Sequence, residues 1–107
     1  MEIKFDKTYL EELYYTGKTT DKKKRFQPHI VKKYALCVKV LEDAEKIEDL
    51  FRYNSLHYQK LIGDKQGLSS LRINDQYRLE FREFYNPNNN LEIEICYLVD
   101  ITNHYKK

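Results

Sequence analysis

The hydrophobic periodicity of this chain changes at Gly63, and the change restricts the folds that the chain can adopt. Before Gly63 the apolar residues recur every three or four positions, which is the spacing that places side chains on one face of an α-helix. After Gly63 they alternate with polar residues, which is the pattern of strands buried on one face. Helical segments followed by a run of strands predict an α+β fold, in which helices cover one face of an antiparallel sheet.

The helical half contains two candidate helices. Residues 2–5 alternate and predict a short first strand, after which Asp6 suits the N-cap of a helix that ends at Gly17. The stretch Lys18–Arg25 has no apolar period and predicts a mobile basic loop, whereas Pro28 suits the first turn of a second helix. The apolar stripe of this second helix consists of Ile30, Val31, Tyr34, Ala35, Val38 and Leu41, with Cys37 near its edge.

The alternating half predicts three strands joined by two polar turns. The strands alternate at 71–73, 77–81 and 91–99, and the turns fall at 74–76 and 86–90. Together with residues 2–5 this gives an antiparallel sheet of about four strands, with the two helices packed on one face. Between the halves, a bend or short third helix is expected to turn Ile47, Leu50 and Phe51 inward.

The turn at 74–76 decides which side chains share a face of the sheet. A turn of three residues places Arg72 opposite Arg78 on the face away from the helices, whereas a shorter turn would bury an arginine against apolar side chains. Adjacent guanidinium groups repel each other, so they require an anion such as an RNA phosphate or carboxylates such as Glu80 and Glu92. The pattern alone leaves both alternatives open.

Composition limits the kinds of protein that this chain can be. The 107 residues predict a single domain over residues 1–107, and a net charge of +2 does not by itself indicate a nucleic-acid partner. Basic residues gather in 18–25 and after residue 70, while acids concentrate in 42–49, so a basic face could meet phosphate. Ordinary solvated surfaces explain the same distribution.

The sequence disfavours membrane-spanning, secreted, disulfide-bonded and metal-binding proteins. No apolar run approaches the roughly 20 residues that span a bilayer, and the first residues lack the apolar core of a signal peptide, so we expect a cytoplasmic protein. Cys37 and Cys96 lie in separate apolar stretches and are expected to be buried free thiols. Because the histidines are isolated in the sequence, we expect no metal site and no cofactor.

The segment GDKQGLSSLRINDQYRLEF, from Gly63 to Phe81, is the most specific motif in the chain. A Gly-Asp-basic-x-Gly turn leads into a strand, and Arg-Ile-Asn-Asp-Gln-Tyr-Arg then crosses a hairpin. In this segment the chain resembles the HigB-type toxins of the RelE/ParE superfamily, or plasmid maintenance system killer proteins. The helices, the sheet and the length are similar too, so the resemblance covers nearly the whole chain and implies a RelE-like fold.

This resemblance implies the toxin of a type II toxin–antitoxin system. Such a toxin is a ribosome-dependent, metal-free endoribonuclease that cleaves translated mRNA. Its implied partners are the ribosome, mRNA and a helix-turn-helix antitoxin similar to HigA, with which it forms a hetero-oligomer. Two alternatives remain: a ParE-like inhibitor of DNA gyrase, which has no need of a general base, and a non-catalytic RNA-binding module on the same fold.

The resemblance also suggests site residues. Arg78 matches a basic residue that contacts the scissile phosphate in RelE relatives, and Arg72 lies where a second basic side chain is usual. Relatives commonly end the last strand with an acid, a tyrosine and a histidine, whereas here His104 precedes Tyr105, so either could act, and Asp100 could orient either. Candidates for RNA binding are Lys60, Lys65, His57, Arg82 and Lys106.

Metal-free cleavage of RNA explains why these residue types fit. The ribose 2′-hydroxyl attacks the adjacent phosphorus, a base takes its proton, and an acid can protonate the departing 5′-oxygen. Histidine suits proton transfer because its pKa lies near neutrality. Arginine suits the phosphate because its planar guanidinium donates two parallel hydrogen bonds and keeps its charge.

Overall fold

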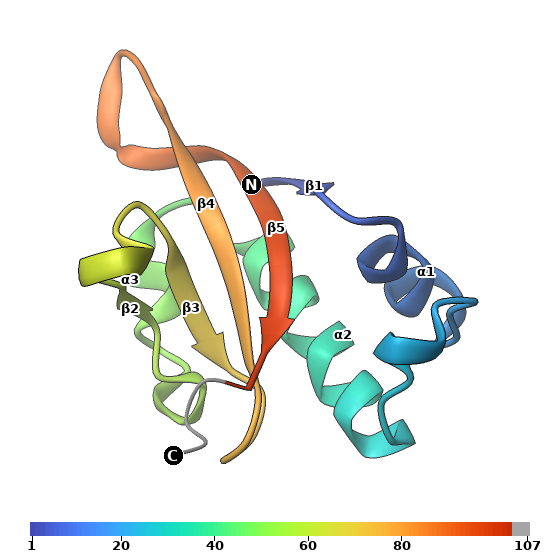
Figure 1. Ribbon diagram of the computed structural model, residues 1–107. Helices are drawn as coiled ribbons and strands as arrows, with labels where there is room; N and C mark the ends of the chain where they lie inside the picture. Colours follow the sequence, from blue (N-terminus) through green and yellow to red (C-terminus); the bar gives the residue numbers. More distant parts are fainter. Residues whose placement is uncertain (104–107) are drawn as a thin grey trace.

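The computed structural model describes residues 1–103 of the chain and confirms the α+β architecture. These residues contain three α-helices, Thr8–Thr16 (α1), Pro28–Asp43 (α2) and the single turn Ile47–Leu50 (α3). The helices lie on one side of a twisted sheet, with α2 behind its central strands, and among residues 1–103 no α-helix lies on the other side, the uncovered face (Figure 1).

Within the described part of the chain, the sheet has five strands in the order β1-β5-β4-β3-β2. They are Glu2–Phe5 (β1), Gln59–Lys60 (β2), Ser69–Arg72 (β3), Arg78–Asn86 (β4) and Asn89–Thr102 (β5). The first strand matches the prediction in its bounds but pairs parallel with β5. The two strands are far apart in the sequence, so no hairpin constrains them to run antiparallel. The two-residue strand β2 at the far edge adds a fifth member to the expected four.

The core lies between α2 and the inner face of the sheet. The buried residues of α2 are Ile30, Val31, Tyr34, Cys37, Val38, Val40 and Leu41, which confirms most of the predicted stripe. Tyr34 is fully buried, and its hydroxyl donates to the carbonyl oxygen of Leu10 at 2.7 Å, so α1 is tied to α2 through a satisfied polar group. Leu71, Leu79 and Phe81 complete the core from the sheet.

Strand β5 departs from the predicted alternation. Its register with β4 shifts at three points, and at two of them a single residue, Val99 or Glu94, has no direct partner in β4. Each such bulge moves the following side chains to the other face. The buried residues are therefore Ile93, Cys96, Leu98 and Ile101, whereas the predicted Ile95, Tyr97 and Val99 are half-buried and Leu91 is exposed.

Two expectations about the helical half are wrong in detail. Helix α1 begins at Thr8 with Lys7 as its N-cap, because Asp6 continues the pairing of β1 by donating its backbone N–H to the carbonyl of Leu98. Phe51 is 57% exposed rather than turned inward, although Leu50 is buried. Gly17 ends α1 with a φ of +76°, as predicted for a left-handed C-cap.

The structure also shows the conformation of the basic loop and the burial of the two cysteines. The stretch Lys18–Arg25 contains a 3-10 turn, Lys22–Lys24, in which the backbone N–H of Lys23 donates to the side chain of Asp21 at 3.0 Å. Cys37 and Cys96 are both free and buried, as expected, and burial raises the pKa of the Cys37 thiol to about 12. Within residues 1–103, no helix is long and apolar enough to cross a bilayer.

Candidate functional site

The hairpin between β3 and β4 turns over three residues, as predicted. The backbone N–H of Ile73 donates to the carbonyl of Tyr77 at 2.9 Å, and Arg72 lies directly opposite Arg78. The side-chain oxygen of Asn74 accepts hydrogen bonds from the backbone N–H groups of Gln76 and Tyr77 at 2.9 and 2.7 Å, which fixes the turn. This register puts both arginines on the uncovered face of the sheet.

The two arginines are held differently. Arg78 is only 6% exposed, and its Nη1 donates to Ser70 Oγ at 2.6 Å. Burial and the neighbouring positive charge of Arg72 lower the pKa of Arg78, although a guanidinium stays charged at neutral pH. Arg72 is more exposed and forms a salt bridge with Asp75 in the turn.

A carboxylate therefore offsets the repulsion at Arg72, but it comes from the turn. The sequence suggested Glu80 and Glu92 for this role. Glu92 instead accepts a hydrogen bond from the Asn86 side chain at 2.7 Å, near the far end of the hairpin. Glu80 is 2% exposed and bonds to Lys65 Nζ at 2.7 Å. Its negative charge also acts on Arg78 and opposes the lowering of the pKa of Arg78, as the sequence suggested.

Glu80 brings three segments together on the uncovered face. Its Oε2 atom accepts a hydrogen bond from Lys65, in the 3-10 turn Gly63–Lys65, and another at 3.2 Å from the hydroxyl of Thr102 at the end of β5. Thr102 lies opposite Arg78 in the β4–β5 register. The loop cation, the buried arginine and the end of the last strand are thus neighbours.

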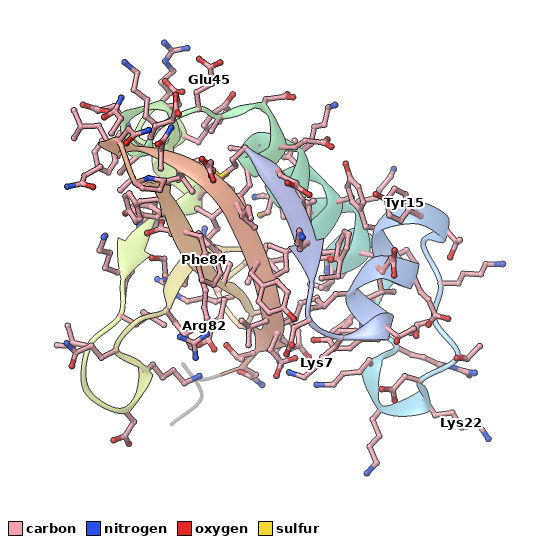
Figure 2. The ribbon with its side chains drawn as sticks, turned by 90° about the horizontal axis from the view of Figure 1, so that it is seen from above. Lys7, Tyr15, Lys22, Glu45, Arg82 and Phe84 are labelled. Carbon is pink, nitrogen blue, oxygen red and sulfur yellow. The ribbon has the colours of Figure 1, made fainter. Side chains whose placement is uncertain are left out.

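Arg82 extends this face along β4. It alternates with Arg78 and Glu80, is exposed, and lies opposite Tyr97 of β5. Figure 2 shows its side chain pointing away from α2, while Lys7 and Lys22 lie on the side of α1. A Cβ atom at Gly67, whose φ is +96°, would lie 3.3 Å from Arg82 Nη1, so the loop before β3 passes close to this arginine.

Lys60 and His57 do not join the arginines. Lys60 lies opposite Ser69, whose neighbour across β4 is the core residue Phe81, so it projects from the helix-covered face. Its Nζ donates to Tyr85 Oη at 3.0 Å and lies 3.7 Å from Glu83. His57 has a positive φ of 47° and lines a separate surface hollow beside α3.

Asp100 is engaged on the side of α1. The hydroxyl of Tyr9 donates to its Oδ1, and the ammonium groups of Lys7 and Lys24 each lie 3.5 Å from the carboxylate. Burial acts to raise the pKa of Asp100, but the Tyr9 hydrogen bond and the two lysine charges outweigh it and hold the pKa below its usual value. The other candidates at the chain end, His104, Tyr105 and Lys106, lie outside the described residues.

The uncovered face carries several cationic side chains. Arg72, Arg78 and Lys65 present cationic donors from three adjacent positions. Among residues 1–103, no group of three or more His, Cys, Asp and Glu side chains could hold a metal ion. This arrangement can bind and polarise a phosphate.

Sequence reasoning missed Ser70 and Thr102 and did not identify the partners of Glu80 and Arg72. The signal for Ser70 was present, because a three-residue turn places Ser70 opposite Glu80 on the face of Arg78. Thr102 could not have been found, since the bulge at Val99 decides which face it occupies. Asp75 stands three residues after Arg72, but its side chain could equally have capped the turn.

Comparison with protein families gives a match to residues 3–99, which include both arginines and the loop that carries Lys65. The matched family is described as the RelE-like toxin of type II toxin–antitoxin system HigB. The chain belongs to the HigB-like toxin family. RelE-like toxins are typically ribonucleases, and a type II toxin implies a cognate antitoxin. No curated protein matches the chain.

Proposed function

We propose that this HigB-like toxin cleaves mRNA on the translating ribosome by a metal-free reaction at the uncovered face of its sheet. The observation that supports the proposal most is the pairing of Arg72 with Arg78, with Lys65 held beside them by Glu80. Asp75 and Glu80 partly neutralise these cations in the free protein, and an RNA phosphate would be a further anion for them to bind. Arg82, on the same face, would contact the RNA backbone further along the strand.

In the proposed reaction the ribose 2′-hydroxyl attacks the adjacent phosphorus and the 5′-oxygen of the next nucleotide departs. This produces a 2′,3′-cyclic phosphate and a 5′-hydroxyl. Arg78 and Arg72 stabilise the charge that develops on the phosphoryl oxygens. A preorganised donor of this kind contributes roughly 3–4 kcal/mol to transition-state stabilisation.

We assign the proton transfers to His104 and Tyr105. They follow Thr102 in the sequence by two and three residues, and Thr102 lies opposite Arg78. One group takes the proton of the 2′-hydroxyl and the other protonates the leaving oxygen. Lys106 would add a contact to the RNA backbone, whereas we leave Lys60 and His57 out of the site because they lie away from the arginine face.

In the cell, the proposed toxin acts in the cytoplasm and is neutralised by a helix-turn-helix antitoxin in a hetero-oligomer. Covering the arginine face or obstructing entry into the ribosome would each suffice for inhibition. Both routes require the antitoxin to bind the folded toxin tightly enough to outcompete the ribosome.

The test is induced expression with mapping of RNA 5′ ends. We expect growth arrest and new 5′-hydroxyl ends inside the open reading frame of a reporter transcript. A reporter with its start codon removed should stay intact. Arrest with an induced DNA-damage response and intact transcripts would contradict the proposal and indicate gyrase inhibition. RNA binding without arrest or cleavage would indicate a non-catalytic module.

A further inference from the structure

A buried carboxylate lies in the middle of the cationic face. The side chain of Glu80 is 3% exposed and stands on the same face of β4 as Arg78, two residues away. A negative charge at this position repels an incoming phosphate, and its burial carries a desolvation cost. A role in binding RNA directly would therefore not account for a glutamate here.

The contacts of Glu80 explain why a glutamate occupies this position. Its Oε2 atom accepts from Lys65 Nζ at 2.7 Å and from Thr102 Oγ1 at 3.2 Å. Lys65 comes from the turn Gly63–Lys65, and Thr102 ends β5. One oxygen atom thus ties the loop before β3 and the last residue of β5 to the strand that carries Arg78.

Lys65 remains accessible in this arrangement. Its side chain is 38% exposed, compared with 3% for Glu80, so solvent reaches the ammonium but scarcely reaches the carboxylate. An ammonium has three N–H groups, and the hydrogen bond to Glu80 uses one of them. A phosphate held by the arginines could receive a further hydrogen bond from the same ammonium.

We propose that Glu80 is a positioning residue, which fixes the Lys65 ammonium and the end of β5 beside Arg78 so that Lys65 serves as the third cation of the phosphate site. The inference rests on the proposed RNA cleavage, and it adds a loop residue and its anchor to the arginine pair. It also explains why the Gly63–Lys65 turn packs against the sheet. Lysine has a flexible stem with about four rotatable bonds, so an unanchored Lys65 would populate many positions.

The test compares E80Q with a matched control on the other face of the same strand. Glu83 is 4% exposed at its side chain and lies 3.7 Å from Lys60, but it faces Tyr58 and the core. We expect E80Q to lower the single-turnover cleavage rate on programmed ribosomes about tenfold or more with little change in the ribosome concentration at half-maximal rate, and E83Q to change the rate less than twofold. If Glu80 acted only as a repulsive charge, E80Q would cleave faster, which would overturn the proposal.

A double-mutant cycle identifies the residue through which Glu80 acts. K65M alone should lower the rate to a similar extent, and E80Q added to K65M should lower it by less than a further twofold, because the anchored group is already gone. An equal loss from E80Q in both backgrounds would show that Glu80 acts independently of Lys65. If E80Q proves too unstable to purify, E80D and K65R keep the charges. We expect them to retain more activity than K65M, and equal loss would contradict the inference.

Two readouts do not depend on cleavage. Amide hydrogen exchange of residues 63–68 should accelerate in E80Q while exchange at Leu71 and Phe81 stays slow, and unchanged exchange would overturn the positioning role. K65M should also bind a single-stranded RNA oligonucleotide several times more weakly than wild type, and equal affinity would overturn the role of Lys65. If exchange and affinity change as expected but wild type cleaves no translated mRNA, the proposed function fails while the inferred cation site stands.

Discussion

Arg72 and Arg78 face each other across the hairpin, and Asp75 in the turn forms a salt bridge with Arg72. Asp75 is 95% exposed at its side chain, so its salt bridge with Arg72 contributes little to stability. A phosphate that binds Arg72 must therefore compete with Asp75. At the scale of single residues, the turn carboxylate keeps the arginine pair compatible in the absence of RNA and also weakens RNA binding.

Removal of this carboxylate gives a direct prediction. We expect D75N to bind single-stranded RNA several times more tightly than wild type, with a change in unfolding free energy within about 0.5 kcal/mol. Fluorescence anisotropy and thermal unfolding measure the two quantities. D43N, which removes an exposed carboxylate on α2, makes the same change in net charge and should leave the affinity nearly unchanged. Equal tightening in both variants would show that only net charge matters.

Asp100 gives a prediction about acid stability. Its pKa in the folded protein lies below the usual value because the Tyr9 hydrogen bond and two lysine charges outweigh burial. A depressed carboxyl pKa contributes stability that is present above the unfolded pKa, about 4, and is lost as the pH falls through the folded value. The free energy that separates wild type from D100N should therefore shrink between about pH 5 and pH 2 in denaturant titrations. A gap that stays constant over this range would contradict the account.

At the scale of secondary-structure elements, the three-residue turn sets the whole site. The side chain of Asn74 accepts two backbone hydrogen bonds within it. We expect N74A to lower the free energy of unfolding by about 1 kcal/mol, because two N–H groups lose their acceptor. The melting temperature should fall by roughly 4–8 °C for a domain of this size. The control Q76A, at an exposed position of the same turn, should change it little.

The elements that the sequence predicted are those with long, regular patterns. The stripe of α2, the bounds of β1 and the Arg72–Arg78 register followed from hydrophobic periodicity, because one face of each element is buried. The faces of β5 did not follow, since bulges at Val99 and Glu94 interrupt a sequence that alternates regularly. The anchoring of Lys65 by Glu80 also could not be read from the sequence, because it depends on how the loop at 63–65 folds back onto β4.

At the scale of the whole molecule, cationic and acidic side chains lie on different surfaces although the net charge is small. The net charge is only +2, yet Lys65, Arg72 and Arg78 are gathered on the face of the sheet away from the helices. Acidic residues such as Glu48 and Asp49 lie on α3. The protein can therefore present a local cationic surface to RNA while remaining close to neutral overall.

This distribution predicts the salt dependence of RNA binding. If about three phosphates are neutralised, the logarithm of the association constant should fall with the logarithm of salt concentration with a slope near −2, at about 0.7 per phosphate for single strands. R72A should reduce the magnitude of the slope by about 0.7. R52A, which removes an exposed arginine just after α3, should leave it unchanged. A slope that is insensitive to R72A would place the RNA elsewhere.

The central claim is that the arginine pair stabilises the phosphate during cleavage, and the most direct measurement is the single-turnover rate of mRNA cleavage on purified, programmed ribosomes. We predict that R78A lowers this rate about 100- to 1,000-fold, that R72A lowers it by at least tenfold, and that R52A retains the wild-type rate. Thermal unfolding of each variant confirms that the toxin is folded in the assay. Cleavage by folded R78A at the wild-type rate would contradict the account.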